Sequence, residues 1–296
     1  MMRTAGQDER ASLNVSGTSS VYGVWGYPVK HSRSPAMHNA AFAEMGLNAV
    51  YVPFEVEPAS IAAAIDGVRA LGICGINITV PLKELAAACL PDLDPVSRRL
   101  GVVNTIVNRE GNLTGYSTDG PGFMWAIKSL GWPASGQVVH ILGAGGSARA
   151  VADSLAEAGN RLLIANRTRE RAQDLAAQVN KHFPGQAEVV AWGTSVEPAD
   201  LIVNTTSVGM HPNEGDCPPV DAELLRSRPR VYDLIYAPEE TRLLSNAKQY
   251  GCDISNGLGM LVYQGALSLS LWLDRPVNTI PVLAMEHAVR NTIAAK

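Results

Sequence analysis

The stretch GICGINITVPLKE, residues 72–84, delivers a lysine to the end of a short apolar pattern. Asn77 and Thr79 alternate with isoleucines, which is the two-residue period of a strand, and a Val-Pro pair breaks that period before Lys83. The simplest interpretation of Lys83 is a solvated lysine in a turn. The alternative is an acid/base group at a strand end, and other stretches of the chain favour it.

A second stretch with chemical meaning is ILGAGGSARA, which lies between a predicted strand and a predicted helix. Gly143, Gly145 and Ala148 fit the pattern G-x-G-x-x-A. Glycine permits the tight turn and the close approach of a pyrophosphate, and the helix that follows offers unpaired N–H groups and a positive dipole end. Glycine turns are common, but this strand–turn–helix context predicts dinucleotide binding.

The end of the next predicted strand distinguishes the two nicotinamide cofactors. An acidic residue about 20 positions after the glycine turn would bind the ribose 2′-hydroxyl of NAD. This chain instead has NRTRER there, a motif that contains Asn166, Arg167, Thr168 and Arg171. No carboxylate precedes Glu170 in this motif. Because a guanidinium group matches a 2′-phosphate in charge and geometry, we expect NADP rather than NAD, although the motif also suits a solvated helix start.

A dehydrogenase needs an acid/base group that faces its cofactor, because the hydroxyl proton must leave when a secondary alcohol loses hydride. Lys83 can take that proton in a dry cleft, and Asp119, in GYSTDGPG, is the candidate carboxylate to orient it. The glycine and proline after Asp119 suit a junction between domains that open and close. The side chains at similar strand ends that can hold a polyhydroxylated ring are Asn77, Thr79 and Asn104.

The order of the elements predicts the fold. Short apolar runs alternate with helical patterns, which indicates an α/β fold with mostly parallel strands and a doubly wound, Rossmann-like series from Gln137 onward. Predicted strands cover 20–26 and 49–56, and a third strand within 72–84 runs into a turn before Lys83; a hairpin with its turn at 110–111 follows. We expect a loose tail at 1–18, a substrate and catalytic domain at 19–120 and an NADP-binding domain at 121–264, with a cleft between the two domains. The C-terminal helices, about 265–296, are candidates to pack back on the first domain.

The composition excludes several classes of function. The 296 residues carry a formal charge of −4 without a run of like charges, which argues against phosphate-driven nucleic-acid binding. The four cysteines lack metal-ligand spacing and are expected to be reduced, apolar fillers. No apolar run approaches the roughly 18 residues of a membrane span, and the first residues lack the apolar core of a secretory signal. We therefore expect a cytoplasmic protein.

Taken together, the motifs resemble the shikimate dehydrogenase family, whose members act on shikimate or quinate. Nine stretches occur in the family's order over roughly residues 22–265: GYPVKHSRSPAMHNAAF, NITVPLK, GVVNT, STDGPG, GAGGSARA, NRTRER, NTTSVGM, YAPEETRLL and GLGMLVYQG. Several separate motifs in one order are more specific than any single motif.

The resemblance implies NADP-dependent, reversible reduction of 3-dehydroshikimate to shikimate, a step of aromatic amino-acid biosynthesis toward chorismate that needs no metal. It implies that Lys83 is the acid/base group at the C3 oxygen, with Asp119 as its partner. Ser32 and Ser34 would bind the substrate carboxylate. The other implied substrate contacts are Asn77, Thr79, Asn104, Tyr236 and Gln264. The implied NADP contacts are Gly143, Ala144, Gly145, Gly146, Ser147, Asn166, Arg167, Thr168 and Arg171, with Leu234, Gly257 and Met260 on the nicotinamide side.

Some of these residues have simpler interpretations. Ser34 can be only a helix cap, Tyr236 a strand-end aromatic residue and Gln264 an ordinary helix residue. His31 and His38 flank the serine motif without a visible ligand or triad partner, and we interpret both as structural.

One position departs from the family pattern and leaves alternatives open. Relatives commonly have Asn-Thr-Asp at the aspartate motif, where this chain has Ser117. The alternative is a paralogue that acts on quinate, with or without shikimate, or on an aminoshikimate-type analogue. Both serines, and the lack of an acid after the second nucleotide-domain strand, favour shikimate. A non-catalytic NADP-binding module would normally have lost Lys83 or Asp119. We expect a monomer or homodimer that binds small molecules, with neither nucleic acid nor a membrane as a partner.

Overall fold

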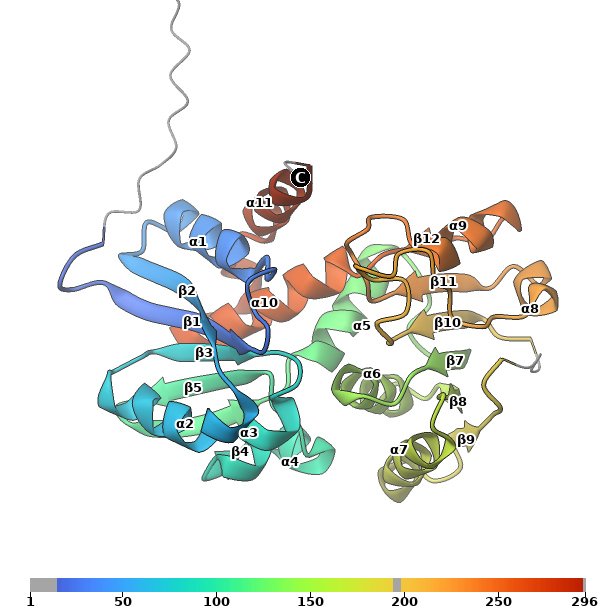
Figure 1. The fold of residues 1–296 in the computed structure, drawn as a ribbon, viewed down its shortest axis with the longest axis horizontal. Coiled ribbons are helices and arrows are strands. Elements are labelled where there is room, and N and C mark those ends of the chain that lie inside the picture. Colours follow the sequence, from blue (N-terminus) through green and yellow to red (C-terminus); the bar gives the residue numbers. More distant parts are fainter. Residues whose placement is uncertain (1–14, 194–197, 295–296) are drawn as a thin grey trace, which may run out of the picture.

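The computed structural model describes residues 15–193 and 198–294. Most of the expected tail, residues 1–14, lies outside the described residues. The chain forms two six-stranded sheets, each flanked by helices, and these two halves lie side by side (Figure 1). The predicted α/β class is confirmed.

The first half is built on a mixed sheet with the strand order β2-β1-β3-β5-β6-β4. β1 pairs in parallel with β2 and β3, whereas β3, β5 and β6 are antiparallel. The predicted hairpin turn is confirmed, since Glu110 and Gly111 have φ of 52° and 86°, as a tight hairpin turn requires. The strands are β1 (Ser20–Gly26), β2 (Ala49–Glu55), β3 (Gly75–Ile78), β4 (Asp92–Leu93), β5 (Thr105–Arg109) and β6 (Asn112–Tyr116).

The helices of this half begin and end where local sequence chemistry permits. Pro35 occupies the first turn of α1, where its missing N–H costs nothing, and Gly46 follows the end of α1 with φ of 63°. Asp94 caps α4 by accepting hydrogen bonds from two backbone N–H groups. The helices are α1 (Ser34–Glu44), α2 (Ile61–Ala70), α3 (Lys83–Cys89) and α4 (Pro95–Leu100), with a short 3-10 turn, η1 (Pro58–Ser60).

The second half is a wholly parallel sheet with the order β12-β11-β10-β7-β8-β9. The order reverses between β7 and β10, and open parallel sheets bind ligands beyond the strand ends at such a point. The strands are β7 (Val138–Leu142), β8 (Arg161–Ala165), β9 (Ala187–Val189), β10 (Leu201–Asn204), β11 (Arg230–Asp233) and β12 (Ile254–Ser255). The helices are α6 (Gly146–Glu157), α7 (Arg169–His182), α8 (Ala222–Arg226) and α9 (Arg242–Gln249).

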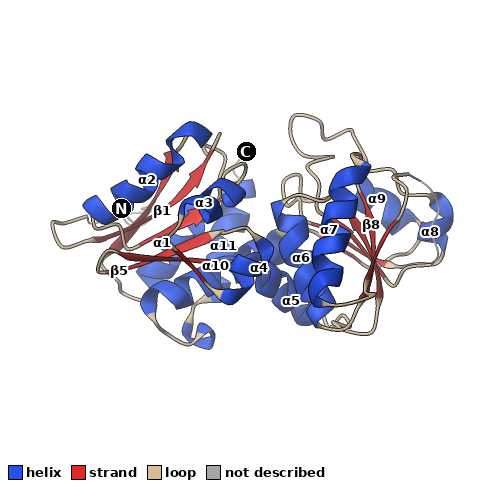
Figure 2. Ribbon diagram, turned by 90° about the horizontal axis from the view of Figure 1, so that it is seen from below, coloured by secondary structure: helices blue, strands red, loops and turns tan. Residues whose placement is uncertain are grey.

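Three further helices join the halves. They are α5 (Asp119–Ser129), α10 (Leu258–Leu273) and α11 (Val282–Ala294), with η2 (Val277–Thr279) before the last. α5 packs against α6 and α10, and α11 packs on α1 of the first half. Figure 2 shows α4 and α10 meeting the helices of the second half at the junction. The domain boundaries expected at residues 120/121 and 264/265 stay a prediction.

Glycines allow these helices to approach closely. A Cβ atom on Gly120 would overlap the backbone carbonyl of Ala150 in α6, and one on Gly122 would overlap the backbone of Gln264 in α10. The first turn of α5 is therefore wedged between α6 and α10, which fixes the residue that begins it, Asp119.

The four cysteines are free, as expected. Cys252 is buried and fills apolar space, as predicted, whereas Cys89 is exposed, so the prediction was wrong for Cys89. Among the residues that the structure describes, no helix is long and apolar enough to span a membrane.

Candidate active site

A pocket of about 180 Å³ lies where the first half meets α10 and the loops that carry Tyr236 and Gly257 in the second half. Its volume is below the roughly 300–1,000 Å³ of pockets for drug-sized ligands, so it suits one small ring. The nine predicted catalytic and substrate-binding residues all line it, namely Ser32, Ser34, Asn77, Thr79, Lys83, Asn104, Asp119, Tyr236 and Gln264. Segments that are distant in sequence therefore meet in one cavity.

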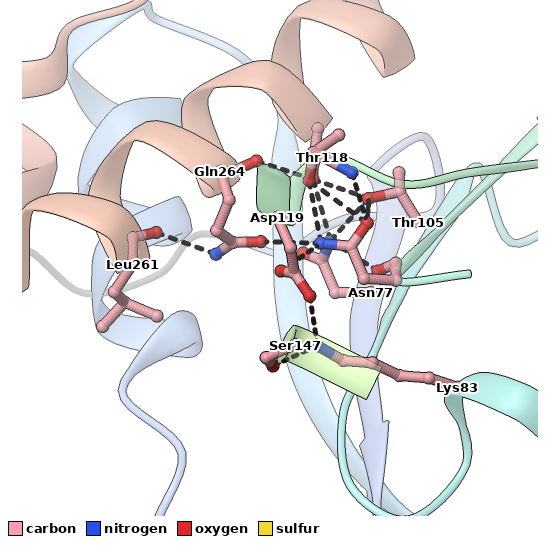
Figure 3. Close-up of polar contacts among 10 residues, drawn as sticks. Asn77, Lys83, Thr105, Thr118, Asp119, Ser147, Leu261 and Gln264 are labelled. Carbon is pink, nitrogen blue, oxygen red and sulfur yellow. Dashed lines mark hydrogen bonds and ion pairs between the residues drawn. The ribbon is translucent and has the colours of Figure 1, made fainter. Parts of the chain in front are cut away.

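Lys83 and Asp119 form an ion pair in this pocket, with Nζ donating to Oδ2 (Figure 3). Their side chains are only 12% and 8% exposed. The predicted turn lies at residues 80–81, and Lys83 is the first residue of the helix that follows it, α3. Asp119 is likewise the first residue of α5. Each helix thus begins with one member of the pair, and the low exposure strengthens their attraction.

Asn104 orients the aspartate. Its amide nitrogen donates to Oδ1 of Asp119 at 2.8 Å and to Oγ1 of Thr118 at 2.8 Å. Its amide oxygen accepts from the backbone N–H of Thr118 at 2.8 Å, which settles which end of the amide faces the carboxylate. A weaker contact of 3.2 Å joins the same nitrogen to Oε1 of Gln264. Asp119 therefore has one oxygen for Asn104 and the other for Lys83.

Asn77 lies in the wall of the pocket, and its side-chain amide makes hydrogen bonds with other protein residues. Tyr51 donates its phenol hydrogen to the amide oxygen at 2.8 Å. The amide nitrogen donates to Oγ of Ser268 at 2.9 Å and to Oγ1 of Thr105 at 3.2 Å. Asn77 is thus held in one orientation by residues behind it, in addition to lining the cavity.

His38 supports this wall from behind. It is fully buried, and its ring stacks on Tyr51 with centroids 4.3 Å apart. Burial lowers the pKa of His38 from 6.5 to about 3. The nearby Asn77 side chain raises this pKa, but by less than burial lowers it. Neither ring nitrogen makes a hydrogen bond with a described residue. His38 is therefore a neutral packing residue, whereas His31, also expected to be structural, lines the pocket.

The two serines lie at the start of α1. Oγ of Ser32 accepts a hydrogen bond from the backbone N–H of Ser34 at 3.3 Å, so this hydroxyl also supports the helix start. Burial raises the pKa of Tyr51 well above its usual value, and a hydrogen bond with the Ser34 side chain opposes that shift. Across the pocket, burial raises the pKa of Tyr236, and the nearby positive charge of Arg33 opposes the shift.

The glycine turn between β7 and α6 fits a diphosphate. Gly143 has φ of 113° and packs so closely on Thr205 that a side chain there would collide. A Cβ atom on Gly145 would meet nothing within 4 Å among the described residues, so a ligand can approach the backbone there. α6 starts without a side-chain cap from the described residues and without an acid in its first turn. Its N–H groups and dipole are thus available to an anion.

The end of β8 fits a phosphate on the ribose. Asn166 donates its side-chain N–H to the carbonyl oxygen of Thr168 at 2.8 Å, which shapes the turn before α7. Arg167 and Arg171 are exposed, and neither makes an ion pair with any residue in the described ranges. Two positive side chains that lack a counter-charge among the described residues match the doubly charged 2′-phosphate of NADP.

The residues predicted on the nicotinamide side also converge. A Cβ atom on Gly257 would overlap the carbonyl group of Leu234, so these two backbones touch. The backbone N–H of Met260 donates to the phenol oxygen of Tyr232 at 3.1 Å. Gly257 and Met260 both line the pocket. The predicted nicotinamide site is therefore continuous with the predicted substrate site.

The side chains that orient the pocket residues from behind, Tyr51 and Ser268, were not predicted from the sequence. The two-residue period of its strand places Tyr51 on one face with Ala49 and Pro53, and in the structure Tyr51 pairs with Tyr22 of β1. Ser268 lies four residues after Gln264 and therefore on the same face of α10. Neither residue belongs to a recognisable sequence motif, so the sequence did not indicate a role for either one.

Taken together, the fold and the site define a class: a two-half α/β protein that places a buried lysine–aspartate pair beside a dinucleotide turn. Among the described residues, no group of three or more His, Cys, Asp and Glu side chains is arranged to hold a metal ion. Three family models match the chain. They describe the shikimate dehydrogenase substrate binding domain (residues 24–106), shikimate/quinate 5-dehydrogenase (126–211) and the shikimate 5′-dehydrogenase C-terminal domain (257–290). The chain belongs to the shikimate dehydrogenase family.

Individual relatives agree with this assignment. Shikimate dehydrogenase (NADP(+)) of Symbiobacterium thermophilum is 46% identical over 91% of this chain and 95% of its own. The structure of shikimate 5-dehydrogenase from Thermus thermophilus in complex with NADP(H) and shikimate has a TM-score of 0.84 at 38% identity, over 92% of this chain and 99% of that one. The ligand-free 5-ketofructose reductase of a Gluconobacter strain has the same TM-score, 0.84, at 35% identity over 94% of this chain and 100% of that one.

Proposed function

We propose that this chain catalyses the NADP-dependent, reversible reduction of 3-dehydroshikimate to shikimate. One observation carries the proposal: the Lys83–Asp119 ion pair lies in the substrate pocket, and Lys83 Nζ is also 3.3 Å from Oγ of Ser147 in the nucleotide turn. A proton donor and the predicted cofactor site thus face one cavity. The relatives named for this activity support the same conclusion.

In the reductive direction Lys83 gives a proton to the C3 oxygen, and in the oxidative direction it takes that proton back. Asp119 accepts a hydrogen bond from Lys83 and so aims Nζ into the pocket. Bound NADPH would supply the hydride to C3. Because the pair is nearly buried, little bulk water competes for the proton.

The remaining pocket residues bind and orient the substrate in this proposal. Ser32 and Ser34 hold the carboxylate with their hydroxyl groups, and Arg33, which lies between them in sequence, adds a positive charge near Tyr236. The ring hydroxyls are held by polar side chains of both halves, namely Asn77, Thr79, Asn104, Tyr236 and Gln264.

The cofactor contacts follow the strand ends of the second half. The turn 143–147 binds the diphosphate, and residues 166–171 bind the adenosine 2′-phosphate. Leu234, Gly257 and Met260 face the nicotinamide. A cytoplasmic location, a role in chorismate biosynthesis and a monomeric or homodimeric state belong to the same proposal.

A second candidate is a paralogue with another cyclic polyol or its ketone. The likeness to a 5-ketofructose reductase favours it, because that relative has the same fold at similar identity and a different substrate in its name. Quinate and aminoshikimate-type compounds are further members of this class. A non-catalytic NADP-binding module is disfavoured because Lys83 and Asp119 form an ion pair inside the pocket.

The test is an initial-rate assay of NADPH or NADH absorbance. Shikimate and quinate are each offered with NADP and with NAD, and 5-ketofructose is offered with NADPH. We expect the highest kcat/KM for shikimate with NADP, since that ratio compares transition-state binding. A higher value for quinate or 5-ketofructose would reassign the substrate, and cofactor binding without any turnover would support the binding module instead.

A further inference from the structure

The two halves are joined by an ion pair whose residues do not line the pocket. Nε and Nη2 of Arg99, in α4 of the first half, donate to Oδ1 and Oδ2 of Asp153, in α6 of the second half, at 2.8 and 2.5 Å. Two parallel hydrogen bonds of this kind fix direction as well as distance. The side chains are 20% and 6% exposed, so solvent screens the pair little.

Other contacts strengthen the hold of Arg99 on the second half. Its guanidinium carbon lies 5.5 Å from the ring centroid of Phe183, and Glu157 of α6 is 3.8 Å from Nη2. The side-chain nitrogen of Gln178, in α7, donates to the carbonyl oxygens of Arg99 and Leu100 at 2.8 and 3.0 Å. The end of α4 is therefore clamped to both α6 and α7.

Helix α6 carries the effect of this clamp to the catalytic lysine. Ser147, in its first turn, accepts a hydrogen bond from Lys83 Nζ at 3.3 Å, and Gly146 lies against the aliphatic part of Lys83. Asp153 is six residues further along, or about 9 Å at 1.5 Å per residue. A helix is stiff over that length, so a displacement at Asp153 moves the nucleotide turn relative to Lys83.

The other links between α6 and the first half restrain it less. Arg149 is 3.4 Å from Glu84, but this pair is 29% and 55% exposed, and exposed pairs contribute little. Leu100 and Val102 form a small apolar contact with Ala150, which permits sliding. The pair of Arg99 and Asp153 is thus the directional restraint.

We propose that Arg99 is a positioning residue, which holds Asp153 and thereby fixes the nucleotide turn against Lys83 at the separation that hydride and proton transfer require. The inference rests on the proposed function, since it concerns the geometry of that reaction. It assigns Arg99 no contact with substrate or cofactor.

The kinetic test compares Arg99→Gln, Arg99→Lys and Asp153→Asn with the parent. Arg98→Gln is the matched control, because Arg98 is the neighbouring arginine of α4 and its ion pair with Asp92 is exposed and confined to the first half. We expect Arg99→Gln and Asp153→Asn to lower kcat by about tenfold or more, since small misplacements of reacting groups are costly. The KM for shikimate should stay within about twofold, and Arg99→Lys should restore part of kcat.

Two readouts do not depend on turnover. NADPH fluorescence titration should give Kd values within about threefold of the parent, because the proposed contacts to the diphosphate and the 2′-phosphate all lie in the second half. Small-angle X-ray scattering should give a larger radius of gyration for Arg99→Gln and Asp153→Asn than for Arg98→Gln, because the halves separate. If Arg99→Gln does not fold, the kcat and the radius of gyration of Asp153→Asn and Arg99→Lys test the proposal instead. Asp153→Asn keeps the shape of the aspartate side chain.

The outcomes separate the two claims. Parental kcat and parental radius of gyration in both Arg99→Gln and Asp153→Asn would overturn the role of Arg99. Equal losses of kcat and NADPH affinity would also overturn it, because they would indicate a damaged cofactor site. If the parent turns over neither shikimate nor any other substrate tested, the proposed function fails, and scattering alone still decides whether Arg99 sets the separation of the halves.

Discussion

The amide nitrogen of Asn104 lies 2.8 Å from Oδ1 of Asp119, whose other oxygen accepts a hydrogen bond from Lys83. Asn104 is 3% exposed and its amide oxygen is engaged by the N–H of Thr118, so the amide cannot turn without losing that bond. The carboxylate is therefore aimed from one side by an amide and from the other by an ammonium group. The orientation of the lysine depends on a residue that need not touch the proton at all.

Replacement of Asn104 by alanine should reduce turnover more than stability. Without the amide, Asp119 can rotate and Lys83 loses its fixed direction, so we expect kcat to fall by about tenfold to a hundredfold. Steady-state kinetics and thermal unfolding would measure the two effects. Asn108→Ala is the control, because the Asn108 amide also makes hydrogen bonds within the first half, donating to the backbone carbonyl of Ile73 at 2.8 Å, but Asn108 lies outside the pocket lining. Equal kcat in both variants would show that Asp119 needs no such support.

Replacement of Arg167 by glutamine should change cofactor preference. The guanidinium group is exposed at the end of β8, where an adenosine 2′-phosphate would lie. We expect the KM for NADP to rise about tenfold and the KM for NAD to stay unchanged, since only NADP carries the phosphate. Arg226→Gln, on the surface of α8, controls for a general loss of positive charge. A parallel rise in both KM values would argue against a 2′-phosphate contact.

The raised pKa of Asp233 should make the free energy of unfolding fall as the pH rises. It is fully buried at the end of β11, and burial raises its pKa from 3.8 to about 6, although hydrogen bonds from Thr241 and Asn204 oppose this. Between about pH 4 and pH 6 the unfolded chain has lost the proton while the folded chain keeps it. The free energy of unfolding therefore decreases across that window, by on the order of 3 kcal/mol.

Asp233→Asn removes that titration and keeps the side-chain shape. The stability of the variant relative to the parent should rise between pH 4 and pH 6 and then level off. Urea unfolding at several pH values measures the difference. A difference that stays constant across the window would mean that Asp233 ionises normally in the folded chain.

His140 should have the opposite pH dependence. It is 3% exposed on β7, neither ring nitrogen has a partner among the described residues, and burial lowers its pKa from 6.5 to about 4. As pH falls from 6.5 to 4, the unfolded histidine gains a proton that the folded one resists. The parent therefore loses on the order of 3 kcal/mol over that range.

Leucine is apolar and similar in size to histidine. We expect His140→Leu to have a higher free energy of unfolding than the parent at pH 5, and the difference from the parent to be smaller at pH 7. The same urea experiments at both pH values measure the gain. His182→Leu, in the last turn of α7, is the control for adding a leucine elsewhere in the second half. A gain for His140→Leu that is larger at pH 7 than at pH 5 would contradict the lowered pKa.

Much of the fold followed from local patterns in the sequence. The strand 20–26, the helix from Ser34 and the turn at 110–111 appear as predicted, because alternation, capping residues and glycine act within a few residues. The short elements β4, β12, α3 and α4 were missed, since two to seven residues carry too little periodicity. The turn that ends on Lys83 was predicted, but the helix that begins there, α3, was not.

The site was predictable only where a motif marked it. Residues from the serine, lysine, aspartate and glutamine motifs do line one pocket. Tyr51, Ser268 and the pair of Arg99 with Asp153 were not predicted, because their partners lie in other elements and their spacing along the chain carries no period. Contacts of that kind appear only once the two sheets and α10 are placed together.

The central claim is that Lys83 moves the proton at the substrate oxygen, and the rate of NADPH oxidation with 3-dehydroshikimate tests it most directly. For Lys83→Ala we predict a kcat at least about a hundredfold below the parent, the usual contribution of a general acid, with NADPH affinity unchanged by fluorescence titration. A kcat near the parental value in a folded Lys83→Ala protein that still binds NADPH would contradict the account.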